Sequence, residues 1–151
     1  MTRIYRFEVV RKALNVASLP DRIVRSSMDV AAVVRAAIGN IDHEVFVVLH
    51  LDAKNRIRGV HEAGRGSRTA CFVDPVEVFR AAVIAGATSI VLAHNHPSGD
   101  PTPSSEDLAI TRKLDEGARF LGIRVLDHVV IGEDGHHSML DSKTFRFWQA
   151  A

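Results

Sequence analysis

The chain has 151 residues, of which 46% are hydrophobic and 25% are charged, and this composition suits one globular domain with its own core. Its 19 basic side chains nearly balance its 18 acidic ones, so the overall charge does not favour a nucleic-acid partner. The single cysteine, Cys71, excludes an internal disulfide, and no apolar stretch is long enough to span a membrane. We therefore expect a cytoplasmic protein without a membrane partner, whose oligomeric state the composition leaves open.

The first half of the chain predicts a helix between strands. Residues 4–10 permit a strand, and the alanine- and valine-rich residues 29–38, which end at Gly39, predict a helix. Residues 45–51 are almost all apolar and many are β-branched, so we expect a central strand buried on both faces. A turn follows, and residues 57–61 are expected to return as a hairpin partner.

The next segment predicts a loop and then a helix. We expect a flexible connection at residues 64–67 and a short strand near residues 71–73. Asp74 as the N-cap and Pro75 at the first helical position predict a helix that runs to about Gly86. The spacing of the apolar residues predicts one buried face on this helix, formed by Val76, Phe79, Ala82 and Val83.

The remaining elements continue the alternation of strands and helices. Residues 89–93 and 125–131 predict buried strands, residues 105–121 predict a helix between them, and residues 136–140 predict a last short strand. Three aromatic residues of the tail are expected to dock on the core: Phe145, Phe147 and Trp148. This order of elements predicts an α/β or α+β fold in which helices flank a mixed sheet.

Two histidines follow the strand at residues 89–93, and their spacing predicts a metal site. Side chains two apart in an extended segment share one face, so His94 and His96 can point toward one ion. Ser104 and Asp107 have the spacing of a capping box, which would hold the Asp107 carboxylate near the strand end. Two histidines and one carboxylate are typical of catalytic zinc, because they leave a fourth position open for water. We therefore predict Zn²⁺ bound by His94, His96 and Asp107.

Five residues in their spacing resemble the JAMM metalloprotease motif of JAB/MPN domains: Glu44, His94, His96, Ser104 and Asp107. Three longer sequences are similar, more narrowly, to the bacterial RadC family: LDAKNR at residues 51–56, HNHPSGD at 94–100 and LDHV at 126–129. The resemblance covers roughly residues 26–140. It implies a zinc-binding domain with a mixed sheet between helices, in the cytidine-deaminase-like architectural group.

The resemblance also implies a division of the chain and a role for each site residue. We expect residues 26–151 to form the JAB/MPN metal-binding domain and residues 1–25 to be an extension that packs a strand on the core. An extension of this length would lack the helix-hairpin-helix module that typical RadC proteins carry. The implied roles are general base for Glu44 and oxyanion donor for Ser104. The implied activity is hydrolysis of an amide bond in a peptide or isopeptide-linked protein.

Simpler interpretations of the same residues stay open. Ser104 and Asp107 also fit a helix N-cap and a first-turn acid, and Glu44 fits a solvated strand end. We expect His128 to be a core residue or a partner of a metal ligand rather than a ligand. The competing function is a non-catalytic metal-binding interaction module associated with DNA repair, with nucleic acid as its partner. A nucleobase deaminase is excluded, because its Pro-Cys-x-x-Cys motif needs two cysteines and the chain has one.

Overall fold

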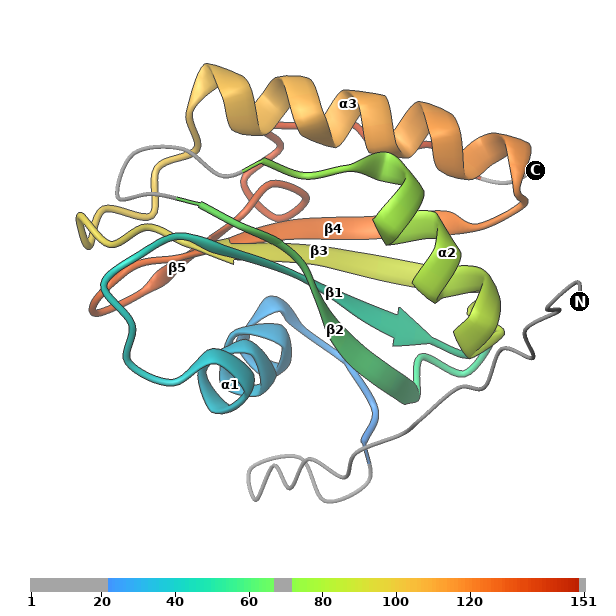
Figure 1. Ribbon diagram of the computed structural model, residues 1–151, viewed down its shortest axis with the longest axis horizontal. Coiled ribbons are helices and arrows are strands. Elements are labelled where there is room, and N and C mark those ends of the chain that lie inside the picture. Colours follow the sequence, from blue (N-terminus) through green and yellow to red (C-terminus); the bar gives the residue numbers. More distant parts are fainter. Residues whose placement is uncertain (1–21, 67–71, 150–151) are drawn as a thin grey trace, which may run out of the picture.

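A computed structural model describes residues 22–66 and 72–149 of the chain as a sheet between helices (Figure 1). The strand expected at residues 4–10 lies outside the described residues, as does Cys71. Within these residues the helices are α1 (Ser27–Ile38), α2 (Pro75–Ala85) and α3 (Ser105–Phe120). The strands of the same described ranges are β1 (Val45–Leu51), β2 (Ile57–Arg65), β3 (Ser89–Asn95), β4 (Arg124–Ile131) and β5 (His136–Ser138).

The strands form one mixed sheet in the order β2-β1-β3-β4-β5. β3 and β4 are parallel, and the other neighbouring strands are antiparallel. A parallel pair needs a crossover connection, and α3 supplies it between β3 and β4. Every residue of β1 and β3 is buried, as the apolar pattern of β1 predicts. The observed class is therefore α+β with a mixed sheet flanked by helices, as expected.

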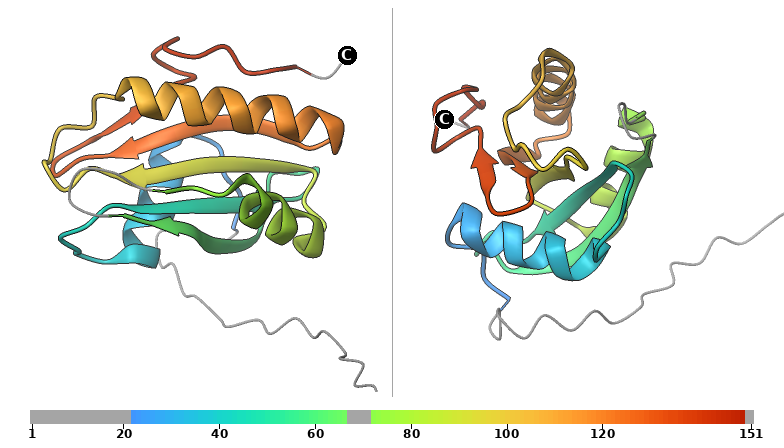
Figure 2. Two further views of the ribbon diagram at one scale, coloured as in Figure 1. Left: turned by 45° about the horizontal axis from the view of Figure 1, so that its top comes forward. Right: turned by 90° about the vertical axis from the view of Figure 1, so that its left-hand side faces the viewer.

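Helices cover both faces of the sheet, so the described part of the chain has two hydrophobic cores. α1 lies on one face, while α2 and α3 lie side by side on the other (Figures 1 and 2). Alternate residues of the central strands divide between the cores. Val47, Leu49 and Val91 belong to the α1 core, whereas Val48 and Leu92 belong to the α2/α3 core. A side chain on β3 therefore faces either α1 or α3, according to its position in the alternation.

Local sequence explains where each helix begins. Ser26 and Asp29 close a capping box at the start of α1. Asp74 caps α2 by accepting a hydrogen bond from Val76 N–H, and Pro75 occupies the first helical position. These caps confirm the predicted helix starts to within a few residues.

β2 is longer than predicted. The expected flexible connection at residues 64–67 begins inside the strand, because Gly64 and Arg65 pair with β1. Arg65 also forms a bidentate ion pair with Glu62 at 2.7 and 2.8 Å. Glycine and arginine favour a loop when considered locally, but the backbone of β1 supplies partners that the local sequence does not reveal. The strand expected near residues 71–73 is wrong for Phe72 and Val73, which lie outside the strands, and Phe72 is 91% exposed.

The buried face of α2 also differs from the prediction. Val76 and Val83 are 57% and 61% exposed, whereas Val78 is fully buried. Phe79 and Ala82 of the predicted face do pack in the α2/α3 core. Almost every residue of α2 is apolar, so hydrophobic periodicity alone could not determine which side meets the sheet.

Leu126 of β4 has no partner in β3, so β4 forms a bulge at this residue. Beyond the bulge, His128 pairs with Leu92, whose side chain belongs to the α2/α3 core. Paired residues share a face, so His128 points to the face that also carries His94. Strict alternation from Val125 would instead have turned His128 toward α1. The extra residue is therefore what brings the two histidines to one side of the sheet.

The C-terminal tail packs on the α2/α3 core, as predicted. Phe147 is 4% exposed, and Phe145 packs against the same core. The backbone N–H of Trp148 donates to the Asp115 carboxylate of α3 at 3.2 Å. None of the helices within residues 22–66 and 72–149 combines the length and apolarity needed to cross a membrane.

A histidine pair lies under α2, away from the predicted site. His50 Nε2 of β1 is 2.8 Å from His61 Nδ1 of β2, and the two rings stack at 5.0 Å between centroids. His50 is 2% exposed. Burial, together with the neighbouring His61 ring, lowers the pKa of His50 to about 4, and burial also lowers the pKa of His61. The folded protein therefore keeps His50 neutral at pH values where an unfolded chain would protonate it.

We expect this pair to make the folded state less stable as the pH falls below 6.5, the ordinary pKa of histidine. Between that pH and about 4 the unfolded chain binds more protons at His50, so the free energy of unfolding drops. The drop from this residue is about 2 kcal/mol between pH 7 and pH 5. Urea unfolding of wild type and His50→Leu with a chelator present measures it, since other groups titrate in both proteins. Parallel pH profiles for the two proteins would contradict the expectation.

Candidate metal centre

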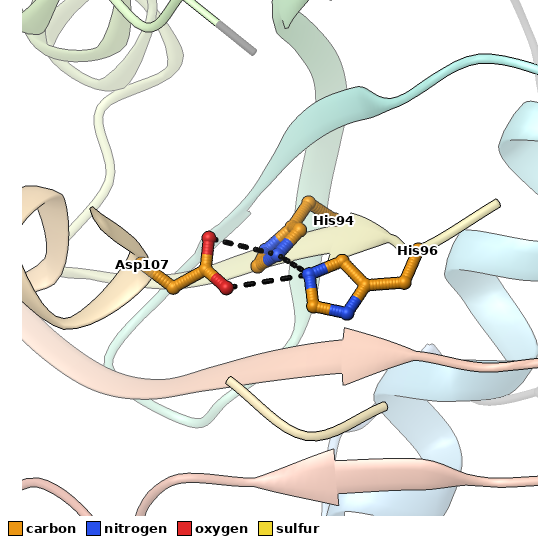
Figure 3. A group of neighbouring side chains, drawn as sticks. All are labelled: His94, His96 and Asp107. Carbon is orange, nitrogen blue, oxygen red and sulfur yellow. Dashed lines mark hydrogen bonds and ion pairs between the residues drawn. The ribbon is translucent and has the colours of Figure 1, made fainter. Parts of the chain in front are cut away.

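The candidate metal centre lies at the carboxyl end of β3, where α3 begins (Figure 3). His94 belongs to β3, His96 follows the strand end, and Asp107 lies in the first turn of α3. The His96 N–H donates to the Ile131 carbonyl of β4 at 2.8 Å, which continues the sheet pairing past the end of β3. His94 and His96 point to the same side, as their spacing predicts.

The three side chains converge on one point. The Nε2 atoms of His94 and His96 are 3.0 Å apart. The Asp107 carboxylate places Oδ1 3.2 Å from His94 Nε2 and Oδ2 3.3 Å from His96 Nε2. One ligand atom from each residue lies within 4.8 Å of the others, so this cluster could hold a metal ion. His94 is fully buried and Asp107 is 8% exposed, whereas His96 is partly open to solvent.

The outer nitrogen of His96 determines the state of the nitrogen that faces the cluster. His96 Nδ1 lies 2.8 Å from the carbonyl oxygen of Asp100, which can only accept a hydrogen bond. The Nδ1 atom must therefore carry the hydrogen. In the neutral ring this leaves a lone pair on Nε2, directed toward His94 and Asp107.

A hydrogen-bond chain imposes the same state on His94. Thr111 Oγ1 lies 2.6 Å from the Asp107 carbonyl, so it donates its one hydrogen there. Thr111 must then accept from His128 Nδ1–H, which is 2.5 Å away. His128 Nε2 is left as an acceptor, 2.8 Å from His94 Nδ1, which donates to it. The chain ends in a lone pair on His94 Nε2, aimed into the cluster.

Apolar packing keeps water away from the hydrogen bonds that link Thr111, His128 and His94. The Phe46 ring of β1 stacks on His94, with centroids 5.9 Å apart and planes 8° from parallel. The same ring meets the edge of His128 at 5.3 Å. His128 is fully buried, and burial lowers its pKa well below the ordinary value, which favours the neutral ring that the chain requires.

Two imidazole lone pairs and a carboxylate that face one another require a positive charge between them. Burial acts to raise the pKa of Asp107, but hydrogen bonds from His94 and His96, when a proton occupies their Nε2 atoms, hold it well below its ordinary value. The bond to Asp107 in turn raises the pKa of His96. A proton can supply part of the missing charge, and a metal cation can supply all of it. An ionised carboxylate and two neutral rings are the donor states that a divalent metal needs, so these residues fit one.

Glu44 immediately precedes β1 and lies half-buried beside the cluster. Burial raises the pKa of its carboxyl, and the charges of His94, Asp107 and His96 also act on it. The carboxyl is therefore within electrostatic range of all three predicted ligands. The role of Glu44 as a general base stays a prediction.

Ser104 is the N-cap of α3, and the predicted capping box is confirmed. Its Oγ accepts from the Asp107 N–H at 3.1 Å, and Asp107 Oδ2 accepts from the Ser104 N–H at 2.7 Å. The second of these bonds helps to fix the orientation of the Asp107 carboxylate. Accepting a hydrogen bond does not use the hydroxyl hydrogen, so Ser104 can cap the helix and still donate elsewhere. Its catalytic role stays a prediction.

The loop that carries His96 packs tightly against Gly132, just past β4. A Cβ atom at Gly132 would lie 2.3 Å from the carbonyl oxygen of Gly99 and 2.8 Å from Pro101 Cδ. Gly99 itself has a φ of 88°, a conformation that favours glycine. Gly132 therefore allows a close approach that keeps the Asp100 carbonyl against His96.

Sequence reasoning did not identify Thr111 as part of the site. The signal was its spacing from Asp107, because residues four apart on a helix lie one turn apart on one side. His128 was expected to be a core residue or a partner of a ligand. It is both, since it is fully buried and hydrogen-bonded to His94.

The sequence of the chain matches a known protein family. A family model described as the RadC-like JAB domain matches residues 24–144, which include the whole sheet and all five predicted site residues. The chain belongs to the RadC-like JAB domain family. The family resemblance of the sequence is thereby confirmed.

Curated relatives of this RadC-like JAB domain are about 40% identical to it and carry the name UPF0758 protein. One from Desulfitobacterium hafniense (strain DSM 10664 / DCB-2) is 40% identical over 132 residues, covering 87% of this chain and 58% of that protein. One from Methanosarcina acetivorans is 40% identical over 135 residues, covering 89% and 59%. One from Syntrophomonas wolfei is 44% identical over 122 residues, covering 78% and 52%. The chain thus spans little more than half the length of these relatives, whose names state no activity.

We expect Thr111→Val to weaken metal binding by the RadC-like JAB domain about tenfold, with Zn²⁺ as the probe. Valine keeps the shape of threonine but can neither accept from His128 nor donate to Asp107, so the state of His94 is no longer imposed. Thr111→Ser keeps the hydroxyl and should bind zinc within about threefold of wild type. Competition with a chelator of known affinity gives both dissociation constants. Equal dissociation constants for the valine and serine variants would show that the hydrogen bonds from Thr111 through His128 to His94 do not contribute to metal binding.

Gly132→Ala should also weaken metal binding about tenfold, again with Zn²⁺ as the probe. The added methyl group would collide with the backbone at Gly99, so the loop must move and carry the Asp100 carbonyl away from His96. Gly135→Ala is the matched control, because a Cβ at Gly135 meets nothing within 4 Å. The same competition assay should find wild-type affinity for the control. Wild-type affinity for Gly132→Ala would mean that the loop tolerates the shift.

Proposed function

We propose that this RadC-like JAB domain is a zinc-dependent hydrolase that cleaves an amide bond in a peptide or isopeptide-linked protein. The observation that carries the proposal is the convergence of two imidazole lone pairs and a carboxylate beside the half-buried Glu44. Three protein ligands are typical of catalytic zinc, whereas structural zinc usually has four. A nearby carboxyl with a raised pKa is typical of a general base.

His94 and His96 would hold the metal through Nε2, and Asp107 would hold it through a carboxylate oxygen. Zinc supplies a Lewis acid that makes water a nucleophile at neutral pH and polarises the scissile carbonyl. Two histidines and a carboxylate also occur in iron oxygenases, so the identity of the metal as zinc is part of the proposal.

Two side chains perform the proton and charge steps in this proposal. Glu44 accepts a proton from the attacking water and delivers one to the nitrogen of the leaving amine. The Ser104 hydroxyl donates a hydrogen bond to the carbonyl oxygen as that atom gains negative charge. A carbon–oxygen bond forms, the carbon–nitrogen bond breaks, and the products are a carboxylate and an amine. The partly open face of His96 gives a substrate access to the cluster.

Glu44→Gln tests whether metal binding and catalysis are separate. Glutamine keeps the size of the side chain but cannot accept the proton, so we expect full zinc content and hydrolysis reduced by about 100-fold or more. Asp107→Ala removes a ligand, so we expect zinc content to fall sharply. Mass spectrometry of the metals bound to purified protein, zinc and iron included, and cleavage of a fluorogenic peptide library measure the two effects.

Glu116→Gln is the matched control, because Glu116 is an exposed carboxylate on α3 outside the cluster. It should keep both zinc and activity. Full zinc in Asp107→Ala would remove Asp107 from the ligand set, and unchanged hydrolysis by Glu44→Gln would remove Glu44 as the base. If the zinc-loaded wild type cleaves nothing more than the metal-free protein does, the non-catalytic metal-binding module is the better interpretation.

A further inference from the structure

Asn95 stands between two predicted metal ligands, but its side chain does not face the metal cluster. Strand alternation places it on the α1 face of β3, opposite to His94. It is 8% exposed, and both ends of its carboxamide bond to backbone groups. Oδ1 accepts from the Val45 N–H at 2.8 Å, and Nδ2 donates to the His43 carbonyl at 2.9 Å.

These two backbone partners are the residues on either side of Glu44. The backbone pairing of β1 with β3 ends at Phe46 and His94. The carboxamide of Asn95 therefore stands where the next backbone pair would be. From the other side, the N–H of Gly66 donates to the Glu44 carbonyl at 2.8 Å. The segment around Glu44 is thus held by Gly66, just past β2, on one side and by the Asn95 side chain on the other.

We propose that Asn95 is a positioning residue that sets the distance between Glu44 and the metal ligands. His94 and Asn95 are consecutive on β3, so the strand that carries a ligand also fixes the segment that carries the base. This inference rests on the proposed function, because the distance matters to catalysis only if Glu44 is the base. A displacement of about 1 Å at a reacting group can cost about 100-fold in rate.

The carboxamide is the group that this position requires. It offers one acceptor and one donor, which match the N–H of Val45 and the carbonyl of His43. An aspartate would keep the acceptor but would turn a carboxylate oxygen toward the His43 carbonyl, where the two oxygens repel each other. The start of β1 should then move away from β3 at that point and take Glu44 with it.

Asn95→Asp tests the inference, with Asn40→Asp as the matched control. Asn40 is exposed, so the control makes the same chemical change on the surface. We expect Asn95→Asp to keep its zinc, to shift the Glu44 carboxylate by about 1 Å or more in a crystal structure of the zinc-loaded protein, and to lower kcat about 10- to 100-fold with KM within about threefold. The control should match wild type in all three measurements. A Glu44 carboxylate that stays in place in Asn95→Asp would overturn the inference.

A double-mutant cycle separates positioning from a general structural effect. In a Glu44→Gln background, adding Asn95→Asp should lower kcat by less than about threefold, because the carboxylate that Asn95 positions is already absent. If Asn95→Asp lowers kcat as much in this background as it does in wild type, the inference is overturned, since Asn95 would then act by another route. If wild type hydrolyses nothing, the proposed function fails, and the position of Glu44 in the crystal structures still decides the inference. If Asn95→Asp does not fold, Asn95→Gln provides the same structural test with the amide moved by one methylene.

Discussion

The hydrogen bond between His94 Nδ1 and His128 Nε2 is the interaction on which the site depends. An imidazole can present a lone pair to a metal only if its other nitrogen carries the hydrogen, and a donor needs an acceptor. His128 can accept because Thr111 takes its own hydrogen, and Thr111 can take it because its hydroxyl hydrogen goes to the Asp107 carbonyl. The chain begins at one predicted ligand and ends on the residue that supplies another. One set of hydrogen bonds therefore determines which nitrogen of His94 carries the hydrogen and where Asp107 lies.

The topology of the sheet makes this closed arrangement possible. β3 and β4 are parallel, so both strands end at the same edge, and the helix that connects them must begin near that edge. The N-terminus of α3 thus starts where His94 and His96 emerge. The capping box then does two things, because the bonds that begin the helix at Ser104 also orient the Asp107 carboxylate. The bulge at Leu126 completes the arrangement by turning His128 to the same face.

The sequence predicted those parts of the site whose cause is local. The spacing of His94 and His96 follows from strand alternation, and the capping box specifies where Asp107 lies relative to Ser104. It could not predict what depends on residues distant in the chain. The continuation of β2 through Gly64 depends on backbone partners in β1, and the face of α2 that is buried depends on where the sheet lies, because nearly all of its residues are apolar. Thr111 contributes to the site only because the bulge in β4 brings His128 within hydrogen-bonding distance of it.

The alternation of β3 explains why three consecutive residues can serve two different needs. His94 and His96 face α3 and converge with Asp107, whereas Asn95 between them faces α1 and bonds to the start of β1. Every residue of β3 is buried and closely packed, and the Asn95 side chain links this strand to the segment that carries Glu44. His96 lies just past the strand, where its N–H donates to the Ile131 carbonyl of β4 and holds it against the sheet. The end of β3 therefore connects the predicted ligands on one face to the predicted base through a single side chain on the other face.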